Sequence, residues 1–127
     1  MHYHEPPEEL STETRDLHRA FRSLMEEIEA IDWYQHRVDA TSDESLRALL
    51  LHNRNEEMEH AAMTLEWLRR RLPHLDQQLR TYLFTEGPIT EIEEDDMGDR
   101  ASADGATSDA NEGRGLGLSD MKPGRKG

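Results

Sequence analysis

Two long segments that favour helix are separated by a connection of only four residues, 40–43. The first segment extends from about residue 11 to Asp39, and the second continues to Pro73 without a glycine or a proline. Both have the length and the hydrophobic periodicity of helices. Because so short a connection turns the chain back at once, the two helices must pack side by side as an antiparallel hairpin.

Both helices carry residues that cap helix N-termini. Ser11 and Thr12 are suitable caps for the first helix, because their hydroxyls accept hydrogen bonds from free backbone N–H groups. Thr41 with Glu44 forms a capping-box pattern at the start of the second helix. These residues indicate where the two helices begin, to within about two to four residues.

A third, shorter helix is predicted from about residue 75 to 84, with Gly87 and Pro88 ending it and one further turn through Ile92. Seven of the eight glycines lie at Gly98 or later, where the hydrophobic periodicity also stops. The last part of the chain is therefore predicted to be disordered. We find no strand pattern and no internal repeat, so the predicted fold class is all-α.

These features divide the sequence into four parts. Residues 1–10 are predicted to be a flexible N-terminus, and residues 11–96 a helical hairpin domain with its short third helix. Residues 97–112 are predicted to be a disordered acidic linker, and residues 113–127 a C-terminal peptide that contains glycine and leucine.

Composition narrows the function classes. Only 34% of the 127 residues are hydrophobic, which is lean for a self-sufficient monomer and suggests that a partner covers apolar surface. A net charge of −13 excludes nucleic acid and anionic membranes as partners and favours cations. Without cysteine the chain has neither disulfides nor thiolate ligands. With no signal peptide and no apolar run near about 18 residues, we expect a soluble, cytoplasmic protein.

The second helix carries a carboxylate within its apolar stripe. The residues within about 40° of Glu57 on a helical wheel are Leu46, Leu50, Ala61, Thr64 and Leu68. A buried carboxylate needs a compensating cation or partner. His60 lies one turn further on and completes a Glu-x-x-His pattern whose side chains converge.

The first helix repeats this arrangement around Glu27. Ala20, Ile31, Tyr34 and Val38 lie within about 40° of it. One chain therefore offers one lone Glu and one Glu-x-x-His, which is half the ligand set of a di-iron carboxylate bundle. Two chains related by a two-fold axis would supply four carboxylates and two imidazoles. Such ligands suit iron or manganese, and the lack of thiolates argues against structural zinc.

Simpler interpretations of these residues remain open. Glu57 and His60 could form an ion pair on a helix surface, and Glu27 could be a boundary residue of an acidic helix. Tyr34 could be a core aromatic, or its phenol could reach the metal pocket. The remaining group, Glu26, Glu29 and Trp33, fits either a solvated acidic flank or a route by which cations approach the site.

Three segments, MEEIEAIDWYQHRVDA, HNRNEEMEHAAMTLEWLRR and LRTYLFTEGPIT, resemble encapsulated ferritins. The resemblance covers roughly residues 11–91. It implies a ferroxidase whose hairpin dimerises into a ferritin-like four-helix bundle, with the dimers arranged in a ring-shaped decamer. It places the di-iron ligands at Glu27, Glu57 and His60, with Tyr34 beside them. It also implies a second metal site, on the approach to the first, at Glu26, Glu29 and Trp33.

The resemblance also implies a partner, because encapsulated ferritins are carried inside an encapsulin nanocompartment by a C-terminal tag. The last residues, GLGLSDMKPGRKG, are similar to that tag, although Asp120 and Met121 depart from its usual pattern. A short apolar peptide on a flexible tether is suited to docking on a shell protein.

The ligand pattern and the resemblance together imply oxidation of Fe(II) to Fe(III) at a di-iron site across a homodimer interface. Delivery of the iron for storage inside the compartment is implied by the resemblance alone. Two alternatives remain. The chain could be a non-catalytic acidic dimer that buffers metal or acts as an adaptor, or a related di-iron enzyme that consumes peroxide. The physiological oxidant and the fate of the oxidised iron are left open.

Overall fold

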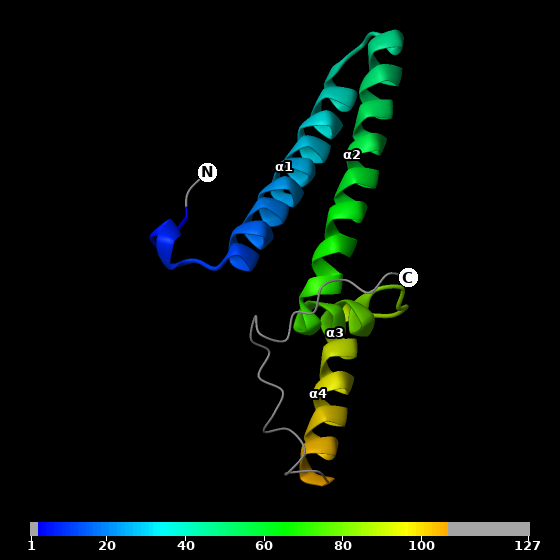
Figure 1. Cartoon of the computed structure of the whole chain (residues 1–127). Coiled ribbons are helices and arrows are strands. Elements are labelled where there is room, and N and C mark those ends of the chain that lie inside the picture. The colour runs from blue at the N-terminus through cyan, green and yellow to red at the C-terminus, as the bar shows by residue number, and fades with distance from the viewer. Residues whose placement is uncertain (1–2, 107–127) are drawn as a thin grey trace. The chain divides into compact units, whose positions relative to one another are not determined.

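The computed structural model describes residues 3–106, with side chains from Tyr3 to Asp99. Its elements are the 3-10 turn η1 (Pro7–Glu9) and the helices α1 (Thr12–Ala40), α2 (Glu44–Arg71), α3 (Pro73–Tyr82) and α4 (Ile89–Ala106) (Figure 1). No strand occurs among these residues, so the predicted all-α fold class is confirmed. The described residues up to Leu68 form one compact unit, and those from Arg69 form another.

The first unit is an antiparallel hairpin of α1 and α2, as predicted (Figure 1). Ser11 caps α1, because its Oγ accepts a hydrogen bond from the Thr14 N–H at 3.0 Å. At the tight connection, the Arg47 side chain donates hydrogen bonds to the backbone carbonyls of Val38, at 3.2 Å, and Thr41. These bonds tie the end of α1 to the first turn of α2.

The start of α2 differs from the predicted capping box. Asp43 is the cap, because its Oδ1 accepts a hydrogen bond from the Leu46 N–H at 2.8 Å. Thr41 instead accepts from the Asp43 N–H at 3.2 Å. The Thr41 hydroxyl is therefore used within the connection, and the expected pairing of Thr41 with Glu44 was wrong.

The N-terminal segment is more ordered than predicted. Its η1 turn is held by Arg15, whose Nε donates to the Pro7 carbonyl at 3.1 Å. The ring of Tyr3 lies 4.6 Å from that of His18, centroid to centroid. Residues 3–10 therefore pack against the first turns of α1, where a flexible terminus was expected.

The hairpin has a thin core. Among the apolar side chains that the structure describes, only Leu17 and Leu68 are buried, and of these only Leu68 is completely so. Large apolar side chains that remain exposed on the hairpin are Phe21, Met25, Ile28, Trp33, Leu46, Leu49, Leu51, Met58 and Met63. A single chain thus leaves much apolar surface in water, as the lean composition suggested. Within the described range, none of the helices combines the length and hydropathy that a bilayer crossing requires.

In the second unit, α3 begins at Pro73, two residues earlier than predicted, because proline is favourable at the first position of a helix. It ends at Tyr82, and Phe84 then adopts a left-handed backbone with φ of 61°. The helix was predicted to continue to residue 84. The helix stops earlier because Leu83 already has an extended backbone, with φ of −70° and ψ of 144°.

Helix α4 is much longer than the single turn predicted through Ile92. It runs from Ile89 to Ala106 and so includes residues 97–106, which were predicted to be disordered. Its N-terminus is acidic, and carboxylates such as Glu91 interact favourably with the helix dipole there. The rest of the predicted linker, 107–112, and the C-terminal peptide, 113–127, lie outside the described residues.

A carboxylate bound by two arginines anchors the start of α3. Arg69 donates a hydrogen bond to Asp76 Oδ1, and Arg80 Nε donates to the same oxygen at 2.9 Å. Burial alone would raise the pKa of the Asp76 carboxyl, but the hydrogen bonds and charges of both arginines outweigh it and hold that pKa below its ordinary value.

Candidate metal centre

The Glu-x-x-His pair lies in the middle of α2. The two residues are one turn apart, and His60 Nδ1 lies 3.5 Å from Glu57 Oε2. The Glu57 side chain is 27% exposed and that of His60 is 49% exposed, so the carboxylate is the more sheltered of the two. The short distance between the two side chains is expected both for two metal ligands and for an ion pair. The neighbouring residues are needed to distinguish these two interpretations.

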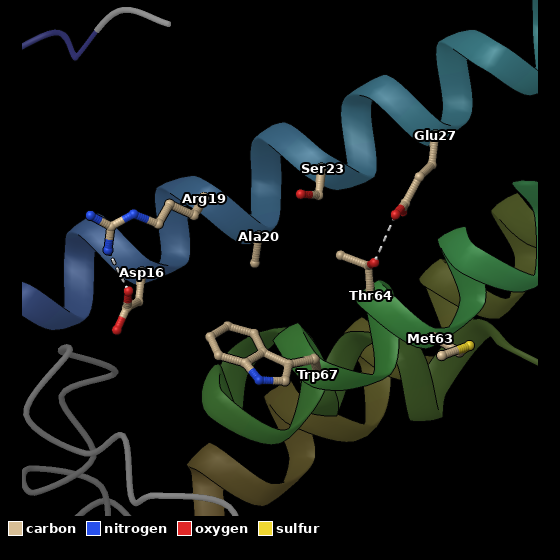
Figure 2. Close-up of a pocket in the computed structure, with 8 residues that line it drawn as sticks. All are labelled: Asp16, Arg19, Ala20, Ser23, Glu27, Met63, Thr64 and Trp67. Carbon is tan, nitrogen blue, oxygen red and sulfur yellow. Dashed lines mark hydrogen bonds and ion pairs between the residues drawn. The ribbon is translucent and has the colours of Figure 1, made fainter.

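Glu27 extends from α1 toward α2 and meets Thr64 (Figure 2). The Thr64 hydroxyl donates a hydrogen bond to Glu27 Oε1 at 3.2 Å. The other carboxylate oxygen, Oε2, is buried and has no hydrogen-bond partner. Since Thr64 follows His60 by one turn, the carboxylate of Glu27 meets the same helix that carries the Glu57–His60 pair.

An open pocket of about 560 Å³ lies between the two helices beside Glu27 (Figure 2). Its lining residues are Asp16, Arg19, Ala20, Ser23 and Glu27 from α1, and Met63, Thr64 and Trp67 from α2. Asp16 and Ser23 were not among the predicted site residues. The signal was present, because both lie within about 40° of Glu27 on the helical wheel. Trp67 of α2 lies across from Ala20 of α1 (Figure 2).

The remaining predicted site residues lie along α1. Tyr34 is partly buried, and the Arg37 guanidinium lies 5.4 Å from the centroid of its ring. Such a distance is typical of a cation–π contact. Glu26 and Glu29 are exposed, and Glu26 Oε1 lies 3.8 Å from Arg22 Nη2. Trp33 is half exposed. The structure thus places these four residues on α1.

The donors suit iron, but one chain does not gather enough of them. Within residues 3–99 there is no group of three or more His, Asp and Glu side chains placed to hold a metal ion. The chain supplies the convergent Glu57–His60 pair and, separately, the unpartnered oxygen of Glu27. Carboxylate and imidazole are ligands that iron accepts. A buried carboxylate oxygen without a hydrogen bond is also the kind of group that a cation would satisfy.

Comparison with known protein families identifies the family of this chain. Residues 2–86 match the EncFtn-like family model, which covers the η1 turn and helices α1 to α3. The chain belongs to the EncFtn-like family. The predicted identification as an encapsulated ferritin is therefore confirmed, and the family match includes Glu27, Glu57 and His60.

The names of three relatives of this EncFtn-like chain agree with the family assignment. A "Ferritin-like protein" of Thermotoga maritima is 62% identical over 96 residues, which are 76% of this chain and 84% of that protein. An "Encapsulated ferritin-like protein" of Rhodospirillum rubrum is 55% identical over 121 residues, 94% of this chain and 86% of that one. The "Encapsulin nanocompartment cargo protein EncC" of Myxococcus xanthus is 36% identical over 85 residues, 62% and 65% of the two chains.

A crystal structure shares the fold. Protein ne0167 of Nitrosomonas europaea superposes with a TM-score of 0.69 and is 58% identical in sequence. The match covers 70% of this EncFtn-like chain and 98% of the other. The helical architecture of the described residues is therefore that of a known solved protein.

Proposed function

We propose that this protein is a ferroxidase, in which two copies pair and bring together two sets of Glu27, Glu57 and His60. Fe(II) is the substrate and Fe(III) the product. The observation that carries the proposal is the buried Oε2 of Glu27, which has no hydrogen-bond partner although it lies beside the helix of the Glu57–His60 pair. A surface ion pair or an acidic solvated face would leave no such group.

The chemistry divides between metal and protein. Each Fe(II) supplies one electron to O₂ or peroxide. The carboxylates of Glu27 and Glu57 provide negative charge that offsets the additional positive charge of Fe(III). His60 adds a nitrogen ligand whose distance to Glu57 is already set by the helix. Tyr34 would lie beside this site, and Glu26, Glu29 and Trp33 would form the approach by which Fe(II) reaches it.

Pairing of two copies is supported by the single chain itself. Its described residues gather no complete ligand group, and its hairpin exposes large apolar side chains on both helices. Burial of such surface is the main force in obligate association. A four-helix bundle made from two hairpins would cover it and supply the missing ligands. Assembly of such dimers into a ring-shaped decamer is part of this proposal.

Association with an encapsulin shell is proposed from the relatives. One is described as encapsulated and another as an encapsulin cargo protein. In this chain, residues 113–127 would dock on the shell protein, and the protein would work inside the compartment. Iron oxidised at the site would then be delivered for storage there.

The test compares Glu57→Ala and His60→Ala with wild type during oxidation of excess Fe(II), followed by loss of ferrozine-reactive iron. Both variants should lose about 100-fold or more in initial rate, because each removes a ligand. His52→Ala is the matched control: His52 also faces a glutamate on α2, with His52 Nε2 3.7 Å from Glu56 Oε1, but both side chains are exposed. Its rate should equal that of wild type.

The same assay separates the proposal from its rivals. Many Fe(II) ions oxidised per site support a ferroxidase. About one per site, or binding without oxidation, would instead indicate a metal buffer or a fixed cofactor. Dilution adds a second check, because a site shared between copies loses specific activity as dimers dissociate. Unchanged rates in Glu57→Ala and His60→Ala would overturn the assignment.

A further inference from the structure

Threonines within helices usually direct their hydroxyls to the helix backbone. The hydroxyl can donate to the carbonyl of the residue three or four positions earlier. Thr81 in α3 does this, since its Oγ1 donates to the Gln77 carbonyl at 3.0 Å. Thr64 in α2 behaves differently, because its hydroxyl donates across the hairpin to a residue 37 positions earlier in the chain.

The partner of Thr64 is the carboxylate of Glu27. The two oxygens of that carboxylate differ in their hydrogen bonding. Oε1 accepts the Thr64 hydrogen bond at 3.2 Å, whereas Oε2 is buried without one (Figure 2). A hydrogen bond to one oxygen restricts rotation of the carboxylate. It thereby holds the other oxygen in a fixed direction.

The helix that carries Thr64 also carries the other ligands of the proposed site. Glu57, His60 and Thr64 are spaced by three and four residues, which places them along one side of α2. Threonine is branched at Cβ, so its side chain has few rotamers in a helix. The Thr64 hydroxyl therefore fixes Glu27, from the opposite helix, in relation to the pair on α2.

We propose that Thr64 is a positioning residue, which orients Glu27 so that Oε2 is the oxygen presented to the metal. This inference rests on the ferroxidase proposal. Groups that orient metal ligands through hydrogen bonds typically change metal affinity by about 10- to 100-fold when removed. The role is distinct from that of a ligand, because the hydroxyl reaches the metal site only through Glu27.

The experiment measures binding of Co²⁺ to the full chain by its visible absorption, at one protein concentration within the dimeric range. Thr64→Val keeps the shape of the side chain and removes the hydroxyl, and it should weaken binding about 10- to 100-fold. Thr64→Ser restores the hydroxyl, and its affinity should lie within about threefold of wild type. Thr81→Val, the matched control, removes a hydroxyl that serves only α3 and should leave the affinity unchanged.

A double-mutant cycle separates positioning from packing. In a Glu27→Ala background the hydroxyl has no carboxylate to orient, so adding Thr64→Val should not weaken Co²⁺ binding further. If Thr64→Val unfolds the hairpin, as judged by circular dichroism, Thr64→Ala takes its place in the same cycle. An undiminished effect of the Thr64 substitution in the Glu27→Ala background would contradict the inference.

Two further outcomes would also overturn it: wild-type affinity in Thr64→Val, or equal weakening in Thr64→Val and Thr64→Ser. Failure of the metal site that the ferroxidase proposal assigns to Glu27, Glu57 and His60 looks different. In that case His60→Ala would bind Co²⁺ as wild type does, whatever the Thr64 variants show. The inference about Thr64 fails alone if His60→Ala loses binding and Thr64→Val does not.

Discussion

Two partly buried carboxylates, one in each unit of the molecule, are satisfied in opposite ways. Asp76 accepts hydrogen bonds from Arg69 and Arg80, which lie within its own unit. Glu27, in the α1–α2 hairpin, has one hydrogen bond from a neutral hydroxyl and one oxygen with none. The second unit thus neutralises its carboxylate with its own cations, whereas the hairpin leaves one oxygen of Glu27 without a hydrogen-bond partner. That difference is the reason why we propose the metal site in the hairpin.

The strongest test of this comparison removes the charge from each carboxylate in turn. Glu27→Gln should leave the metal-free protein as stable as wild type or more so, because an uncompensated buried charge is lost. It should also remove the stabilisation by added Mn²⁺, which at 100 times the dissociation constant is about 2.7 kcal/mol for wild type. Urea unfolding with and without Mn²⁺, at one protein concentration, measures both effects.

Asp76→Asn serves as the opposite case. It should lower the stability of the metal-free protein and leave the Mn²⁺ effect intact, because its partners are arginines and none of the proposed ligands. If Glu27→Gln destabilised the metal-free protein as Asp76→Asn does, the two carboxylates would have the same role. Glu27 would then be a residue that stabilises the fold and not a metal ligand.

The pH dependence of stability sharpens the contrast, because the pKa of Asp76 is lowered in the folded protein. Ionised Asp76 therefore adds stability at pH values above its unfolded-state pKa of about 3.9. This contribution is lost as the pH falls through the lower pKa of the folded state. Near neutral pH, Asp76→Asn should cost about 1.5 kcal/mol, from the loss of charged hydrogen bonds.

Urea titrations of wild type and Asp76→Asn from neutral to acidic pH check this sign. The difference in unfolding free energy should shrink toward zero as the acid becomes strong enough to protonate Asp76 in the folded protein. A difference that is constant across the whole range would show that Asp76 acts through packing and not through its charge.

Much of the hairpin followed from local sequence rules. The four-residue connection, the long segments without glycine or proline and the Ser11 cap all act through neighbours in the chain. The prediction failed where the outcome depended on choices between competing local bonds. Thr41 and Asp43 could each cap α2, and only the geometry of the connection decides which does. The order of residues 3–10 likewise depends on contacts with α1.

The candidate site was predictable in part for the same reason. Helical spacing places Glu57 beside His60, and the structure has them 3.5 Å apart. Spacing within one helix cannot show that Thr64 donates to Glu27, because that bond depends on how α1 and α2 are aligned. Nor can the spacing within one chain show which ligands a second copy of the chain contributes. The assignment of Glu27, Glu57 and His60 as a shared site therefore stays a prediction, which the oxidation and binding experiments address.

The smallest expected effect concerns a third carboxylate, Asp43, which is satisfied by the backbone. Asp43→Ala should lower the unfolding free energy by about 1 kcal/mol, because the Leu46 N–H loses its cap. Asp43→Asn should be nearly neutral, since asparagine caps helices equally well. Thr41→Val should cost less than Asp43→Ala, because it removes only one bond within the connection. Urea unfolding measures all three variants.

Iron oxidation should be unchanged in the three variants, because a carboxylate bonded to backbone N–H groups has no role toward a cation from outside. If Thr41→Val proved the more costly substitution, the capping box predicted from the sequence would be the correct description of the start of α2. If instead Asp43→Ala impaired oxidation at equal stability, the distinction between internally satisfied carboxylates and Glu27 would no longer predict function.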